Sequence, residues 1–228
     1  MPTVAPLLVA AACGSASPPR WNAALGVWEG DRAAGGVEVP DPLYIFGYGS
    51  LCWKAEFPFS TSFVGRVRGW TRYFAQKSTD HRGTPESPGL VCTLLSDAEL
   101  AGLGVTAVAD SSCAGVCYRV ASADAEAVLS NLDFREKGGY TRSVVDVAPA
   151  DGAPTVRALL YTANAENPGF DARAVADPAA AARTIRDAVG PSGPNRVYLE
   201  RLAAWLTSMG ESDGHVDELM AHLSAGET

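Results

Sequence analysis

The order of strand-like and helical segments in the sequence predicts an α+β domain. Apolar runs of strand length fill most of the first part of the chain, one helix interrupts them, and helices with clear capping residues follow. A sheet of this kind can curl into a barrel, and the pattern alone leaves its closure open. The chain of 228 residues fits one such domain well, and its 47% hydrophobic residues are enough for a sizeable core.

The chain divides into three predicted parts. Residues 1–40 are rich in Ala, Gly and Pro without a sustained period, so we expect an N-terminal extension that is loosely ordered or packed on the domain. Its apolar stretch at residues 7–13 lacks a preceding Lys or Arg and is far shorter than the ~20 residues that cross a membrane, so we predict no signal peptide and no membrane span. The main domain is expected over residues 41–210 and a helical tail over residues 211–228.

The predicted strands are short runs of mostly apolar residues. The first run breaks at Gly-Tyr-Gly-Ser, where Gly47 and Gly49 allow positive φ and let backbone amides approach a ligand. A helix is predicted between the fourth and fifth runs. The runs cover residues 43–46, 63–74, 90–95, 114–120, 142–147 and 156–162.

This helix opens near Ser122 and has apolar residues at helical spacing. Two glycines, Gly138 and Gly139, are expected to end it. Its apolar side consists of Ala125, Val128, Leu129 and Leu132.

Two later helices have clear boundaries in the sequence. Asp177 is a good N-cap, Pro178 suits the first helical position, and Gly190-Pro191 is expected to close the far end. The next helix is predicted from Asn195 to Gly210. Its apolar residues are Tyr198, Leu202, Trp205 and Met209, and those of a last amphipathic segment, which we expect to cover the surface, are Val216, Leu219, Met220 and Leu223.

Charge and cysteine content argue against several function classes. The 18 basic and 26 acidic residues give a net charge of -8, which disfavours non-specific binding to nucleic acid. The five cysteines include no Cys-x-x-Cys pair, and with three histidines as possible co-ligands we predict no metal site, even at Cys113 and Cys117. An odd number of cysteines in a chain of this length favours reduced thiols in a cytoplasmic protein.

Three segments combine glycines with polar or charged side chains, at residues 46–51, 78–83 and 132–140. Each has an ordinary structural explanation. A glycine turn after a strand is usually only a turn. Asp80, His81 and Arg82 can form a hydrogen-bond cluster that stabilises a loop, and Glu136 at a helix end can simply be solvated, at a small cost from the helix dipole.

Taken together, the segments Phe-Gly-Tyr-Gly-Ser-Leu, Ser-Thr-Asp-His-Arg-Gly and Leu-Asp-Phe-Arg-Glu-Lys-Gly-Gly-Tyr resemble the ChaC family, the glutathione-specific γ-glutamylcyclotransferases. The resemblance extends from about Tyr44 to Met209, and residues 172–176 depart from the family pattern. It implies a γ-glutamylcyclotransferase-like fold, a small mixed β-barrel flanked by helices, with Glu136 as the catalytic carboxylate. It also implies that the turn holds the substrate, through Ile45, Phe46, Gly47, Tyr48, Gly49, Ser50 and Leu51.

The implied reaction needs no metal or cofactor, because the substrate contains its own nucleophile. The α-amine of the γ-glutamyl group attacks the γ-carbonyl, closes a five-membered lactam and expels Cys-Gly, which leaves 5-oxoproline. Correct orientation of such an intramolecular reaction contributes ~7–11 kcal/mol at best. Glu136 is expected to accept a proton from the amine and return it to the leaving nitrogen.

An anionic substrate needs a locally positive site in this acidic protein. The backbone amides of the turn can bind the γ-glutamyl carboxylate or the developing oxyanion, and the sequence does not assign these two tasks. Arg72 and Tyr198 are plausible polar contacts, although Tyr198 fits a core role equally well. The basic candidates for the site are Arg72, Arg82, Arg135 and Lys137.

Two other functions stay open at this stage. One is a cyclotransferase that acts on another γ-glutamyl amine or on a glutathione conjugate, and the other is a protein that binds γ-glutamyl compounds without turnover. In each case we expect a small-molecule ligand, no membrane or nucleic-acid partner, and a monomer.

Overall fold

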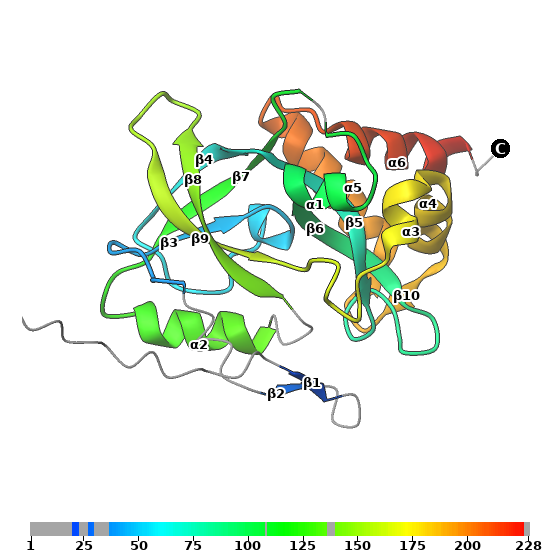
Figure 1. The fold of residues 1–228 in the computed structure, drawn as a ribbon, viewed down its shortest axis with the longest axis horizontal. Helices are drawn as coiled ribbons and strands as arrows, with labels where there is room; N and C mark the ends of the chain where they lie inside the picture. Colours follow the sequence, from blue (N-terminus) through cyan, green and yellow to red (C-terminus); the bar gives the residue numbers. More distant parts are fainter. Residues whose placement is uncertain (1–19, 23–26, 30–36, 108, 136–139, 226–228) are drawn as a thin grey trace, which may run out of the picture.

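The computed structural model combines a β-barrel with a group of helices packed beside it (Figure 1). The structure describes residues 20–22, 27–29, 37–107, 109–135 and 140–225. Part of the sequence-based prediction concerns residues outside this described part of the chain. These are Cys13, Glu136, Lys137, Gly138 and Gly139.

Five strands form a closed barrel. They are β3 (Tyr44–Gly47), β4 (Thr61–Arg68), β7 (Ser112–Arg119), β8 (Thr141–Pro149) and β9 (Val156–Thr162). The order around the barrel is β3-β7-β4-β8-β9, and only β3 and β9 pair in parallel, where Ile45 lies opposite Leu159. Both side chains are fully buried, so the core seals this closure. The barrel with its helices confirms the predicted fold class.

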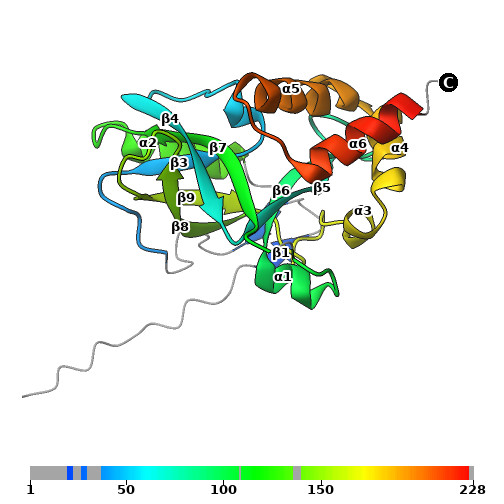
Figure 2. The ribbon, with the colours of Figure 1, turned by 90° about the horizontal axis from the view of Figure 1, so that it is seen from above.

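The prediction of one strand over residues 63–74 is wrong, because the chain forms two strands there. Gly69, with φ of 74°, separates β4 from β5 (Trp70–Ser78). This left-handed conformation favours glycine and redirects the chain. β5 therefore leaves the barrel and pairs with β6 (Gly89–Ser96) in an antiparallel ribbon that lies between the barrel and the C-terminal helices (Figure 2).

A short helix, α1 (Asp97–Gly102), follows β6 and was not predicted. It begins with a capping box, in which the Ser96 hydroxyl accepts from the Glu99 amide at 3.3 Å and the Glu99 carboxylate accepts from the Ser96 amide at 2.7 Å. The Ser-x-x-Glu pattern is a known sequence signal for such a start.

The predicted helix after the fourth run is present as α2 (Ala125–Arg135). Its side chains Val128 and Leu132 are buried, and the helix lies along the barrel, below it in Figure 1. The glycines expected to end this helix fall outside the described residues.

The C-terminal helices pack together on the far side of the ribbon (Figure 2). They are α3 (Ala172–Ala176), α4 (Pro178–Asp187), α5 (Asn195–Ser208) and α6 (Gly214–Ala225). As predicted, the Asp177 side chain caps α4, accepting from the Ala180 amide at 2.9 Å. The predicted end of α4 at Gly190 is wrong, because Gly190 belongs instead to a small hairpin of β10 (Val189–Gly190) and β11 (Gly193–Pro194).

α6 packs its apolar side against α4 and α5, and its Val216 and Leu219 side chains are fully buried. The predicted division of the chain at residues 40 and 210 stays a prediction. In the N-terminal part, β1 (Arg20–Asn22) pairs with β2 (Val27–Glu29).

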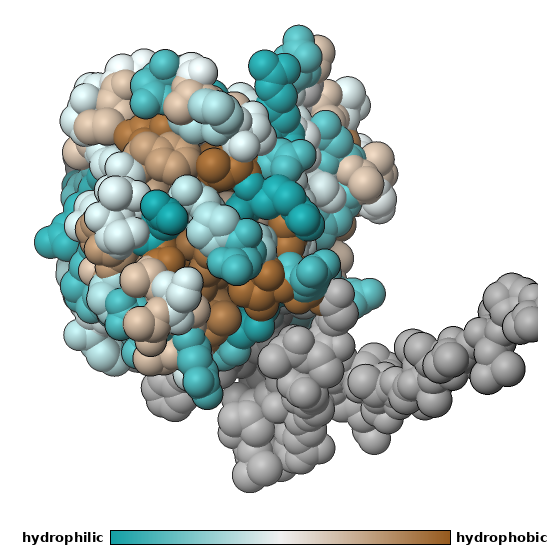
Figure 3. Space-filling view, turned by 90° about the vertical axis from the view of Figure 1, so that its left-hand side faces the viewer, coloured by the Kyte–Doolittle hydropathy of each residue, from teal (hydrophilic) through white to brown (hydrophobic). Residues whose placement is uncertain are grey.

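The surface of the barrel on the left of Figure 1 exposes both apolar and hydrophilic side chains (Figure 3). Within the described residues, no helix has the length and apolar character needed to cross a membrane.

Candidate active site

The glycine-rich turn connects β3 to a short 3-10 helix, η1 (Ser50–Cys52). Backbone bonds from Cys52 to the Gly49 carbonyl and from Lys54 to the Ser50 carbonyl, both 2.9 Å, fold the turn tightly. No described residue accepts a hydrogen bond from the amides of Gly49, Ser50 or Leu51. These N–H groups are therefore available to hold an anionic or developing negative oxygen.

Gly49 lies directly against the side chains of Tyr198 and Cys92. A Cβ atom at this position would lie 2.6 Å from the Tyr198 hydroxyl and 2.9 Å from the Cys92 sulfur. Real Cβ atoms essentially never approach other atoms below 3.0 Å. The turn therefore needs glycine here because of the close contact with Tyr198.

Tyr48 anchors the turn to the barrel. Its hydroxyl donates to the Tyr161 carbonyl at 2.7 Å, and the ring is buried. Its own carbonyl accepts from Nε of Arg72 at 3.0 Å. The structure thus points the Tyr48 side chain into the core, and Ile45 and Phe46 are buried as well. Any substrate contact of Tyr48 would come from its backbone.

Arg72, a predicted substrate contact, is completely buried. Its Nη1 pairs with Asp213 at 2.6 Å and its Nη2 donates to the Ala114 carbonyl at 2.6 Å. Burial favours the neutral form, yet the surrounding groups, Cys113 and Asp213 foremost, raise the pKa of Arg72, so it stays charged. Each guanidinium nitrogen has an acceptor, and this favours a role in holding the turn through the Tyr48 carbonyl.

Tyr198 combines the two roles that the sequence left open. The ring is buried and packs edge-on against Trp53 and Phe74, with ring centres 5.5 and 5.7 Å away. Its hydroxyl lies 3.0 Å from the Cys92 sulfur and faces Gly49. Burial raises the pKa of Tyr198 well above its usual value, so the phenol is neutral.

Tyr140 is the last residue of the third motif. Its electrostatic interaction with Tyr198 contributes to the raised pKa of Tyr198. Tyr140 directly follows residues 136–139 in the chain. Glu136 itself lies outside the described residues, and its assigned role stays a prediction.

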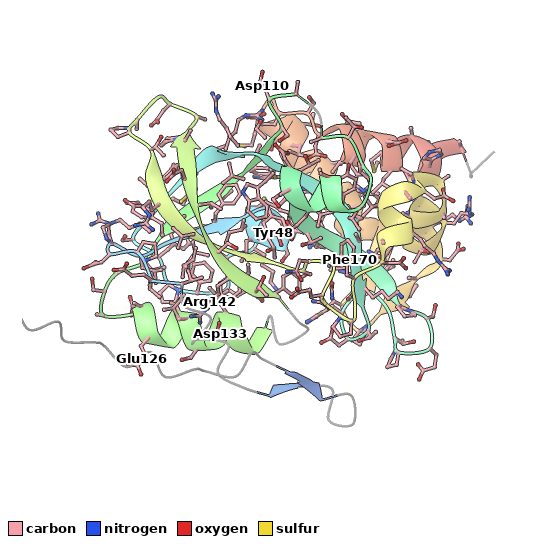
Figure 4. All side chains as sticks on the ribbon, viewed as in Figure 1. Tyr48, Asp110, Glu126, Asp133, Arg142 and Phe170 are labelled. Carbon is pink, nitrogen blue, oxygen red and sulfur yellow. The ribbon has the colours of Figure 1, made fainter. Side chains whose placement is uncertain are left out.

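Asp133 and Arg142 form an ion pair that the sequence did not indicate. Nε of Arg142 donates to Oδ1 of Asp133 at 3.0 Å, and Nη2 of Arg142 contacts Oδ2. The Tyr161 hydroxyl also donates to Oδ1 at 3.0 Å. Figure 4 shows Asp133 and Arg142 next to each other between α2 and the barrel. The pair ties the end of α2 to the start of β8, on either side of residues 136–139.

The Ser78–Gly83 motif packs against the β10–β11 hairpin. The Ser78 hydroxyl accepts from the Arg82 amide at 3.0 Å, and Nη1 of Arg82 donates to the Ser192 carbonyl at 2.7 Å. His81 Nδ1 lies 3.2 Å from the Ser192 hydroxyl. The motif is thus a hydrogen-bonded loop, as its structural explanation expected, and it also places Arg82 beside Tyr198.

The described residues contain no group of three or more His, Cys, Asp or Glu side chains arranged to hold a metal ion. Cys52, Cys92, Cys113 and Cys117 are buried free thiols.

Comparison with known proteins agrees with this architecture. A family model described as "ChaC-like protein" matches residues 43–225. The chain is 36% identical over 182 residues to "Gamma-glutamylcyclotransferase 2-3" of Arabidopsis thaliana, covering 78% of this chain and 86% of that protein. It is 40% identical over 174 residues to the human "Glutathione-specific gamma-glutamylcyclotransferase 1", covering 75% and 72%. The crystal structure of a selenomethionine-labelled yeast γ-glutamyl cyclotransferase specific to glutathione superposes with a TM-score of 0.73 at 25% identity, covering 80% of this chain and 96% of that one.

Proposed function

This chain belongs to the ChaC-like family, and from that premise we propose that it is a γ-glutamylcyclotransferase that cleaves glutathione into 5-oxoproline and Cys-Gly. The observation that carries the proposal is the turn at Gly49, which lies against the Tyr198 hydroxyl and whose Gly49, Ser50 and Leu51 amides have no acceptor among the described residues. Such a turn suits a substrate with a carboxylate and a carbonyl close together, as the γ-glutamyl group has.

The reaction consists of an internal attack. The amine nitrogen forms a bond to the γ-carbonyl carbon, the C–N bond to Cys-Gly breaks, and one proton passes from the attacking to the leaving nitrogen. The protein therefore has to fold the substrate, support negative charge on the carbonyl oxygen and move that proton.

We assign the proton transfer to Glu136, in line with the resemblance to the family. Two observations support this assignment. The Asp133–Arg142 pair joins α2 and β8, the elements that flank residues 136–139 in the chain, and Tyr140, which follows these residues, interacts electrostatically with Tyr198. A carboxylate that accepts the ammonium proton can return it to the departing amine, so one residue serves both steps.

We assign binding of the γ-glutamyl carboxylate and of the oxyanion to the amides of Gly49, Ser50 and Leu51. The neutral Tyr198 phenol can donate a further hydrogen bond beside Gly49. Arg72 supports the turn from behind through the Tyr48 carbonyl.

The test is incubation of the purified protein with glutathione, with 5-oxoproline and Cys-Gly followed by mass spectrometry. Glu136→Gln keeps the side-chain size and removes the base, and Glu126→Gln, an exposed position on α2, is the matched control. We expect both products from the wild type and the control, and none from Glu136→Gln. Saturable binding of glutathione without product would instead identify a binding protein. Product from Glu136→Gln would refute the role of Glu136 and keep the reaction.

We also propose that the protein acts as a cytoplasmic monomer that requires no cofactor or nucleic acid. The buried free thiols and the net charge of -8 support this. Light scattering of the purified protein, which would detect a dimer directly, tests the oligomeric state.

A further inference from the structure

Arg82 lies beside the candidate site and plays no part in the reaction described above. Its guanidinium carbon lies 5.7 Å from the centre of the Tyr198 ring, and the hydroxyl of that ring lies against Gly49. One tyrosine ring therefore separates this cation from the turn.

The Arg82 side chain is held in place by neutral groups. Nη1 donates to the carbonyls of Ser192 at 2.7 Å and Pro194 at 3.3 Å. Within the described part of the chain, Nε and Nη2 of Arg82 have no hydrogen-bond acceptor. One edge of the guanidinium is thus fixed, and the other remains free to bind a ligand.

A second cation, Arg201, lies close by. It follows Tyr198 by one turn of α5, so the two side chains lie on the same side of that helix. Burial is the larger cause of a lowered pKa of Arg82, and the positive charge of Arg201 lowers this pKa further. No described carboxylate raises it. Two cations without an acidic partner among the described residues are unusual in a protein of net charge -8.

Glutathione has a carboxylate at each of its two ends. The turn takes the one on the γ-glutamyl group, whereas the other belongs to the glycine of the leaving Cys-Gly. The two residues of Cys-Gly span about 7 Å when extended. This length is comparable with the distance between Arg82 and the turn, which are separated by the ring of Tyr198. The planar fork of an arginine matches a carboxylate with two parallel hydrogen bonds.

We propose that Arg82, assisted by Arg201, binds the terminal carboxylate of the leaving dipeptide and so determines which γ-glutamyl compounds the protein accepts. The proposal rests on the proposed function and extends it to the leaving group. It predicts selection of γ-glutamyl peptides with a free C-terminal carboxylate over γ-glutamyl amines and peptide amides.

A contact so far from the reacting atoms has a defined kinetic signature. It is made equally in the bound substrate and in the transition state, so its loss raises KM and leaves kcat nearly unchanged. Loss of a residue that merely supports the fold would instead lower the activity on all substrates alike.

The experiment compares glutathione with its glycinamide, in which an amide replaces the terminal carboxylate. We expect the wild type to prefer glutathione by roughly 10- to 100-fold in kcat/KM, as for loss of a charged hydrogen-bond partner. Arg82→Gln is expected to raise KM for glutathione by a similar factor and to reduce the preference to about one, while Arg82→Lys keeps part of it because the charge remains.

Two further variants separate recognition from folding. Arg201→Gln alters an exposed side chain and is expected to weaken the preference by a smaller factor. Arg183→Gln, at an exposed position on α4, is the matched control and should leave the preference unchanged. Equal activity of the wild type on the acid and the amide would overturn the proposal, as would a preference that survives in both Arg82→Gln and Arg201→Gln.

A binding measurement keeps this test independent of turnover. N-acetylglutathione lacks the nucleophilic amine, and calorimetry can compare its affinity with that of its glycinamide. We expect the acid to bind more tightly to the wild type and equally to Arg82→Gln. If the wild type produces no 5-oxoproline, the proposed function fails, and this binding preference still decides the role of Arg82.

Discussion

Asp133 and Arg142 form a two-point ion pair across the segment that contains Glu136. The carboxylate of Asp133 also accepts from the Tyr161 hydroxyl, and the Tyr161 carbonyl accepts from the Tyr48 hydroxyl. The contacts thus run from the end of α2 through β8 and β9 to the glycine-rich turn. This arrangement joins the two elements that flank residues 136–139 in the chain, the segment that carries the proposed proton-transfer residue Glu136.

Loss of this ion pair is expected to impair the reaction more than the fold. Displacement of a reacting group by about 1 Å can cost 10²-fold in rate, so we expect Arg142→Met to lower kcat by roughly 10- to 100-fold. Loss of a charged hydrogen bond should also lower the free energy of unfolding by about 1.5–3 kcal/mol. Initial rates and urea denaturation measure the two effects. Arg157→Met, at an exposed position of β9, is the control, and full activity of a folded Arg142→Met protein would contradict this role of the ion pair.

Gly49→Ala is expected to displace Tyr198 from the turn. The new Cβ would lie 2.6 Å from the Tyr198 hydroxyl and 2.9 Å from the Cys92 sulfur, so the side chains or the turn have to shift. Overpacking of this kind costs typically about 1–3 kcal/mol, and the loss of amide geometry should remove most of the activity. Gly102→Ala is the matched control, because no atom lies within 4 Å of the corresponding Cβ position. Thermal melts and product assays of both variants test this, and equal behaviour of the two would refute it.

Arg72→Met is expected to destabilise the protein strongly. It leaves Asp213 without its buried partner, and the Tyr48 carbonyl loses the Nε donor of Arg72 and keeps the weak contact from the Cys92 thiol at 3.8 Å. Breaking a buried ion pair by removing one partner costs about 3–5 kcal/mol. Urea denaturation should show this loss, and Asp213→Asn should show a similar one. Asp217→Asn, at an exposed position on α6, is the control and should unfold like the wild type. If Arg72→Met also unfolds like the wild type, the Arg72–Asp213 ion pair contributes nothing to stability.

Features set by a few neighbouring residues could be predicted from the sequence. The cap of α4 at Asp177 and the glycine turn after β3 follow from local backbone chemistry, and both appear where expected. Ser96 and Glu99 carry an equally local signal, so α1 could have been found by the same reasoning.

Features that depend on tertiary packing could not be predicted in this way. Arg72 looks like a substrate contact in the sequence, because arginine is rarely buried without a partner. Its partner Asp213 is distant in the chain, as Arg142 is from Tyr161, and no periodicity reveals either contact. A glycine within a strand-like run can form a bulge or can end one strand and begin another, and the sequence around Gly69 does not distinguish the two.

His215 is expected to make the stability of the protein depend on pH. Its Nε2 accepts from the Phe74 amide at 3.0 Å, and burial lowers the pKa of His215 to about 4. The folded pKa lies below the unfolded value of about 6.5, so the stabilisation is full above pH 6.5 and is lost as the pH falls toward 4. A shift of this size corresponds to about 3 kcal/mol. Urea denaturation between pH 7 and pH 4 should show the decline, and His215→Gln should flatten it, whereas His222→Gln, exposed on the same helix, should not. The native state disfavours protonation of His215, whereas the unfolded state does not, and this difference is the cause of the expected decline. If the free energy of unfolding falls equally with pH in the wild type and in His215→Gln, other groups cause the decline.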